Sequence, residues 1–119
     1  RCHMPYTKEH HHIIKKDVFA SMKKTAYFVN VARGPIMNEK DLIDACRNHV
    51  IRGAATDVYE NEPVICDEIT KLDNIVLSPH IGSNVYEARR GMAEEAMDGS
   101  LAVLAGEKPH NIVNPQVLG

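Results

Sequence analysis

A run of apolar and β-branched residues at positions 26–31, interrupted only by Asn30, limits this chain to few folds. Such a run is typical of a strand that is buried on both faces in a parallel sheet. Shorter runs follow at 54–58 and 75–78, and apolar residues recur at helical spacing across 38–50, between the first two runs. Strands that alternate with helices predict an α/β fold with right-handed parallel crossovers.

The flanking segments extend this pattern. Residues 1–5 are predicted to be the end of an earlier strand that leads into a short helix around Phe19. If no strand covers that segment, an apolar sheet edge is exposed and favours self-association. A helix of about six turns is predicted from Asn84 to Gly106, with an apolar stripe for packing. Residues 108–119 show no periodicity.

Composition excludes several classes of function. Fourteen basic and sixteen acidic residues, with no basic block, argue against a nucleic-acid partner. No apolar stretch approaches the ~20 residues that span a bilayer, so no membrane partner is expected. Three widely spaced cysteines indicate reduced thiols in a cytoplasmic protein. Consecutive residues point in different directions, so His10, His11 and His12 predict a solvated loop rather than a metal site.

Polar residues follow each predicted strand, where ligands bind in open α/β sheets. Arg33 follows the first strand, Asp57, Glu60 and Glu62 the second, and His80 the third. A histidine beside a carboxylate is suited to proton transfer, and arginine offers a fork for a carboxylate. The set therefore suits oxidation of a hydroxyl group next to a carboxylate, with a nicotinamide ring as hydride carrier. Taken singly, Arg33 and His80 could be ordinary surface residues, and Asp57 could equally cap a turn.

Three segments carry a family resemblance: NVARG at 30–34, GAATDVYENEP at 53–63 and SPHIGS at 78–83. Together with MPYT at 4–7 and NIVN at 111–114, they make the chain resemble the D-isomer-specific 2-hydroxyacid dehydrogenases over nearly its whole length. The resemblance implies a partial Rossmann-like doubly wound sheet that lacks its first βαβ unit. It also implies a small 2-hydroxy or 2-oxo acid as substrate and NAD or NADP as cofactor.

Residue roles follow from the resemblance alone. Arg33 would bind the substrate carboxylate, and Glu62 would pair with His80, the general acid or base, whereas Glu60 matches no catalytic position. The residues implied to contact the cofactor are Met4, Pro5, Val31, Ala32, Arg33, Asp57, His80, Gly82 and Ser83. The GxGxxG fingerprint does not occur in this sequence.

The resemblance also predicts the domain organisation. Residues 1–107 would be the carboxyl-terminal part of an NAD(P)-binding domain, and residues 108–119 a tail that returns to the substrate domain. The chain alone is expected to be inactive, and the complete protein to form a homodimer. Two alternatives stay open, namely a nucleotide-dependent binding protein such as a corepressor, and an inert truncation product.

Overall fold

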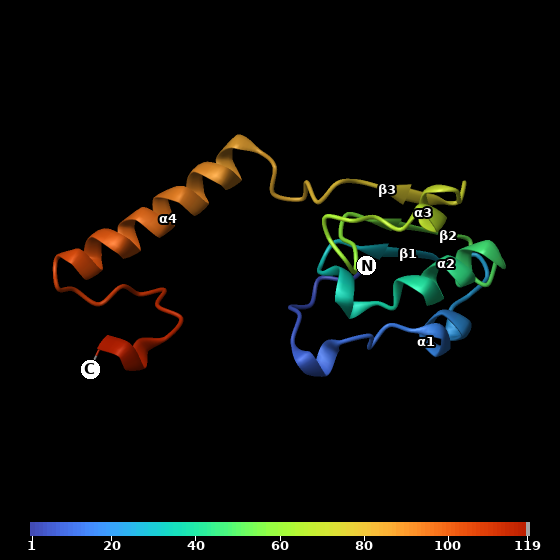
Figure 1. Ribbon diagram of the computed structural model, residues 1–119, viewed down its shortest axis with the longest axis horizontal. Helices are drawn as coiled ribbons and strands as arrows, with labels where there is room; N and C mark the ends of the chain where they lie inside the picture. Colours follow the sequence, from blue (N-terminus) through green and yellow to red (C-terminus); the bar gives the residue numbers. More distant parts are fainter. Residues whose placement is uncertain (119) are drawn as a thin grey trace. The chain divides into compact units, whose positions relative to one another are not determined.

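The computed structural model describes residues 1–118 and contains a parallel sheet of three strands in the order β1-β2-β3 (Figure 1). The strands are β1 (Tyr27–Asn30), β2 (Gly53–Thr56) and β3 (Ile75–Leu77). In the register, Asn30 lies beside Thr56, and Thr56 beside Leu77. The predicted α/β class and parallel sheet are confirmed, and each strand is shorter than its apolar run.

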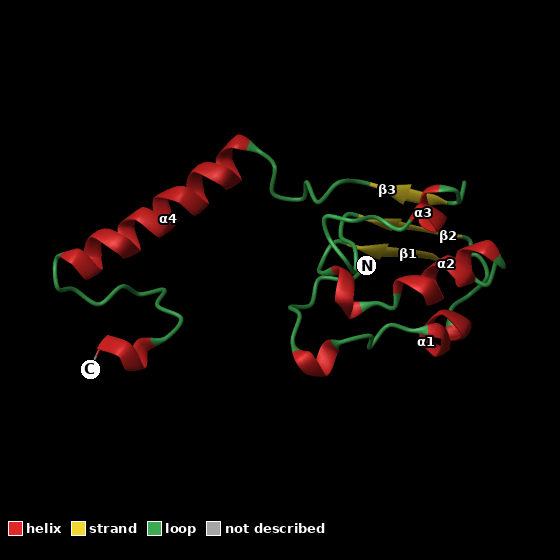
Figure 2. Cartoon of the chain, viewed as in Figure 1, coloured by secondary structure: helices red, strands yellow, loops and turns green. Residues whose placement is uncertain are grey.

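The α-helices of residues 1–118, shown in red in Figure 2, are α1 (Lys16–Ser21), α2 (Glu39–Arg47), α3 (Asp67–Thr70) and α4 (Tyr86–Leu104). The sequence did not predict α3, because four residues are too few to show a helical period. Short 3₁₀ turns are η1 (Lys8–His10), η2 (Gly34–Ile36) and η3 (Pro115–Leu118).

The helix α2 begins where its cap predicts. The side chain of Asn38 accepts a hydrogen bond from the N–H of Asp41 at 3.0 Å, which satisfies a donor that has no partner within the helix. Leu42, Ile43 and Cys46 are buried on one face. That face joins Phe19 and Phe28, whose rings meet edge to face with centroids 5.3 Å apart, in the main core.

Only one face of the sheet is covered within its own unit. Phe28 and Ile75 belong to the main core, whereas Tyr27 and Val76 have 61% and 70% of their surface exposed. The expectation that the first strand is buried on both faces is therefore wrong for this unit. The reason is that the core residues of α1, α2 and α3 all join the cluster on the face of Phe28.

The opening segment lies beside β1. The N–H of Cys2 donates to the carbonyl of Val29 at 2.8 Å, and Cys2 forms a parallel bridge with Asn30. Residues 1–5 form no strand of the sheet, so the predicted earlier strand is reduced to this single bridge beside the end of β1.

The chain divides into two compact units, Arg1–Gly82 and Ser83–Gly119. Within the second unit, Asn111 donates to Glu95 at 2.9 Å, while α4 buries none of its residues, including the predicted apolar stripe. The domain boundary expected after residue 107 concerns the complete protein and stays a prediction. Across residues 1–118, no helix combines the length and apolar character needed to cross a membrane.

Gly34 lies at the closest approach between the segments that follow β1 and β2. A Cβ atom at this position would lie 1.9 Å from the carbonyl oxygen of Tyr59. Since that neighbour is backbone, it cannot rotate away as a side chain would. Glycine is therefore required where these two segments cross.

We expect Gly34→Ala to lower the free energy of unfolding by about 2–3 kcal/mol, because the added methyl group forces the backbone apart. Gly91→Ala is the matched control, since a Cβ there meets nothing within 4 Å and lies in a helix interior, where alanine is favoured. Urea unfolding followed by circular dichroism measures both. Equal stability of Gly34→Ala and the parent chain would contradict the close approach of Gly34 to the backbone of Tyr59.

Candidate active site

Asp57 connects the end of β2 to the segment after β3. Its Oδ1 accepts hydrogen bonds from the Ser78 hydroxyl at 2.6 Å and the Ile81 N–H at 2.9 Å, and its Oδ2 from the Gly82 N–H at 2.8 Å. Burial alone would raise the pKa of Asp57. These three hydrogen bonds, together with the nearby His80, outweigh burial and hold that pKa below its ordinary value. Asp57 therefore shapes the segment that carries His80.

His80 meets Glu62 across the ends of the strands. The Nδ1 atom of His80 lies 2.8 Å from Oε2 of Glu62, and the other carboxylate oxygen, Oε1, accepts the N–H of Tyr59 at 2.9 Å. His80 has a φ of 52°, in the left-handed region that few residues other than glycine adopt. Backbone strain of this kind gathers at functional sites. The ring is 45% exposed, so a ligand can reach it.

The charges around Glu62 favour its ionised form. Burial pushes the pKa of Glu62 upward, but hydrogen bonds from His80 and from the Tyr59 N–H bring it below its ordinary value. The charges of His80 and Arg33 act in the same direction. An ionised Glu62 can stabilise a protonated imidazole.

Arg33 is presented by a turn that Asn30 holds. The side-chain oxygen of Asn30 accepts the N–H of Ala32 at 3.1 Å, and its amide nitrogen donates to the carbonyl of Arg33 at 3.2 Å. Asn30 is fully buried, which explains the one polar residue in the first apolar run. Arg33 itself is exposed, with Nη1 donating to the carbonyl of Ala32 at 2.7 Å. Its guanidinium is thus available to an anionic ligand.

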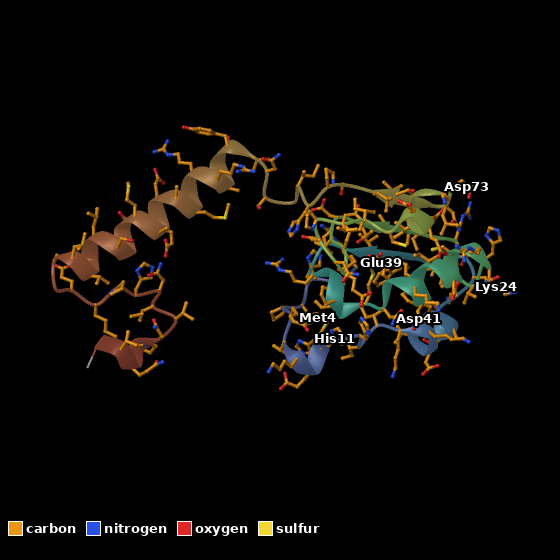
Figure 3. The ribbon with its side chains drawn as sticks, viewed as in Figure 1. Met4, His11, Lys24, Glu39, Asp41 and Asp73 are labelled. Carbon is orange, nitrogen blue, oxygen red and sulfur yellow. The ribbon has the colours of Figure 1, made fainter. Side chains whose placement is uncertain are left out.

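A hollow of about 650 Å³ opens beside this turn. Its lining includes five residues that are expected to contact the cofactor, namely Met4, Pro5, Val31, Ala32 and Arg33. His3, Tyr6 and Pro35 complete the lining. Figure 3 labels Met4 at this end of the first unit. The lining joins apolar side chains to His3, Tyr6 and one arginine, which suits a ring system with a charged neighbour.

The first unit therefore brings together most of the predicted site. Arg33, Asp57, Glu62 and His80 all follow strand ends within Arg1–Gly82, whereas Ser83 begins the second unit. Gly82 approaches Asp57 so closely that a Cβ would lie 3.2 Å from Oδ2.

Sequence reasoning gave no role to Tyr59 and Ser78. The Tyr59 hydroxyl donates to the carbonyl of Ser78 at 2.8 Å, and the Ser78 hydroxyl donates to Asp57. Ser78 stands directly after a predicted strand, and Tyr59 is an aromatic residue inside a polar loop. These positions are the only features of the sequence that could have indicated a role for the two residues at the site.

Comparison with known proteins identifies the family of the chain. The family model of the D-isomer specific 2-hydroxyacid dehydrogenase, NAD binding domain, matches residues 1–82. A glyoxylate reductase of Thermofilum pendens is 48% identical over 117 residues, which cover 98% of this chain and 34% of that protein. The chain thus spans about a third of the length of this relative.

Solved structures agree. The NADPH-dependent glyoxylate/hydroxypyruvate reductase of Sinorhizobium meliloti, in complex with NADP and malonate, has a TM-score of 0.88 at 28% identity, over 95% of this chain and 36% of that one. D-lactate dehydrogenase of Lactobacillus jensenii, solved with NAD⁺, has a TM-score of 0.82 at 27% identity, over 93% of this chain and 38% of that one. With its Rossmann-type strands and matched sequence, the chain belongs to the NAD-binding domain family of the D-isomer specific 2-hydroxyacid dehydrogenases.

Proposed function

We propose that the complete protein is an oxidoreductase that interconverts a 2-hydroxy acid and a 2-oxo acid with NAD or NADP. The contact between His80 and Glu62 carries this proposal. It occupies Nδ1 of the ring and leaves Nε2 for a substrate oxygen. Arg33 lies close enough for its charge to lower the pKa of Glu62, so a substrate carboxylate bound by Arg33 would lie near the same pair.

Each residue then has a distinct task. In the reducing direction, protonated His80 donates its Nε2 proton to the carbonyl oxygen of the substrate, and in the oxidising direction the neutral ring accepts it. Ionised Glu62 stabilises the imidazolium and fixes the orientation of the ring. Arg33 binds the substrate carboxylate with two parallel hydrogen bonds. Hydride would be supplied or accepted by a nicotinamide cofactor when one is bound.

The cofactor would lie along the hollow and the strand ends. Met4, Pro5, Val31 and Ala32 offer an apolar surface for it, next to Arg33. Gly82, which has no side chain, would let the backbone approach the cofactor closely, and Ser83 stays a predicted contact. Asp57 would act near the nicotinamide carboxamide while its oxygens hold the segment 78–82 in place.

The substrate class follows from the same groups. Binding of a carboxylate by Arg33 and of an adjacent oxygen by His80 suits a 2-oxo or 2-hydroxy acid, which is supported by the similarity to a glyoxylate reductase. The homodimer and the cytoplasmic location stay predictions for the complete protein.

We expect His80→Ala in the full-length protein to lower kcat by about 10²–10⁴-fold, because the proton donor is lost. NADH affinity, measured by fluorescence titration, should change little. His49→Ala is the control, since His49 is exposed and precedes β2, at the end of the sheet opposite the strand ends that carry the site. Its kcat should equal that of the parent protein.

Unchanged turnover in His80→Ala would refute the acid–base assignment. A parent protein that binds NADH but reduces no member of a panel of 2-oxo acids would instead favour a nucleotide-dependent binding protein of the corepressor kind.

We expect Arg33→Lys to raise KM for the 2-oxo acid and lower kcat, because lysine keeps the charge but loses the planar fork. The loss should be about tenfold or more in kcat/KM, since a hydrogen bond to a charged group contributes roughly 1.5–3 kcal/mol. Steady-state kinetics measure the effect on the 2-oxo acid, and NADH titration measures the effect on cofactor affinity. A change confined to NADH affinity would assign Arg33 to the cofactor alone.

A further inference from the structure

A second histidine–glutamate pair lies next to the proposed active site and has no part in the proposed chemistry. Nε2 of His12 lies 2.5 Å from Oε1 of Glu60, and the two side chains are only 27% and 23% exposed. His12 also stacks on His11, with ring centroids 3.9 Å apart, and has a φ of 51°. A partly buried polar contact that joins residues 48 positions apart, at a histidine with strained backbone, needs a structural or functional reason.

Glu60 also exchanges hydrogen bonds with Glu39. Oε2 of Glu60 accepts the N–H of Glu39 at 3.1 Å, and Oε2 of Glu39 accepts the N–H of Glu60 at the same distance. Glu39 is the first residue of α2, 7% exposed, and labelled in Figure 3. Its N–H has no partner within the helix, and the helix N-terminus favours an anion. These reciprocal bonds fasten the segment after β2 to the start of α2.

The fastened segment is the one that carries Glu62. Tyr59, directly before Glu60, donates its N–H to Glu62, and Glu62 contacts His80. The carboxylates of Glu60 and Glu62 therefore bind different parts of the fold, although both belong to one short segment. Glu60 binds the start of α2 and His12, whereas Glu62 binds the segment after β3.

We propose that Glu39, Glu60 and His12 are positioning residues that fix the segment 59–62 so that Glu62 meets His80. The inference rests on the proposed function. Its physical basis is that Glu39 accepts the backbone N–H of Glu60, while His12 and the Glu39 N–H hold the Glu60 side chain. Held in this way, the segment presents the Glu62 carboxylate to the ring of His80. A displacement of about 1 Å is enough to lower a catalytic rate by up to about 10²-fold.

The test uses Glu60→Ala in the full-length protein. We expect kcat to fall about tenfold through the loosened Glu62, with KM for the 2-oxo acid and NADH affinity within about twofold of the parent. Glu60→Gln should restore most of the rate, because its amide oxygen still accepts the Glu39 N–H. The matched control is Glu68→Ala, since Glu68 is 61% exposed and pairs with Arg47 on the surface. Its kcat should be unchanged.

A second readout follows the pKa of Glu62 by NMR of protein labelled with ¹³C at the glutamate carboxyl carbons, with Glu62→Gln identifying the signal. His80 and the Tyr59 N–H lower this pKa in the folded protein, so loosening the segment should raise it toward its ordinary value. Removing a neighbouring negative charge without movement would lower it instead. The direction of the change thus separates positioning from charge.

Three results would overturn the inference: a parent-like kcat and Glu62 pKa in Glu60→Ala, a lowered Glu62 pKa, or a uniform loss of rate, affinity and Tm that Glu60→Gln does not restore. If Glu60→Ala fails to fold, Glu39→Ala is measured in the same way, with Glu39→Gln as the restoring variant because its amide oxygen still accepts the Glu60 N–H. Failure of the proposed function is recognised separately, by parent-like turnover in His80→Ala. The NMR readout needs no turnover, so a raised Glu62 pKa would still support positioning.

Discussion

The arrangement of the site depends on the hydrogen bonds that the carboxylate of Asp57 accepts. Parallel strands do not by themselves determine where the segments after them go. Asp57 directly follows the end of β2 and accepts three hydrogen bonds from the segment after β3, two of them from backbone N–H groups. This places His80 over the end of the neighbouring strand, where the segment after β2 can reach it.

The segment after β2 is held from both sides. Gly34 lets the turn after β1 approach it at Tyr59, and Glu39 fastens it at Glu60. Arg33 stands on the same turn as Gly34. The positions of Arg33, Glu62 and His80 are thus linked through contacts of their segments. Only Glu62 and His80 are described as bonded to each other directly. A site built this way combines exposed, reachable side chains with a buried support.

Much of this arrangement could be predicted from sequence, since apolar runs separated by a capped helix give a parallel sheet, and a parallel sheet gathers its strand ends. Arg33, Glu62 and His80 were identified on that basis and by resemblance. Other features gave no local signal. The donors to Asp57 at Ile81 and Gly82 are backbone groups, which any residue but proline possesses. The pairing of His12 with Glu60 spans 48 positions, and α3 is too short to show a period.

The register of the sheet has a consequence for how the protein can fail. Asn30, Thr56 and Leu77 lie side by side at the last positions of their strands. A slip of one residue in β1 would shift the following turn by about 3.3 Å and turn Asn30 to the opposite face. Such a molecule could keep its helices and its spectroscopic signature yet hold a misassembled site. Specific activity per folded molecule would then measure the fidelity of strand pairing as well as the chemistry.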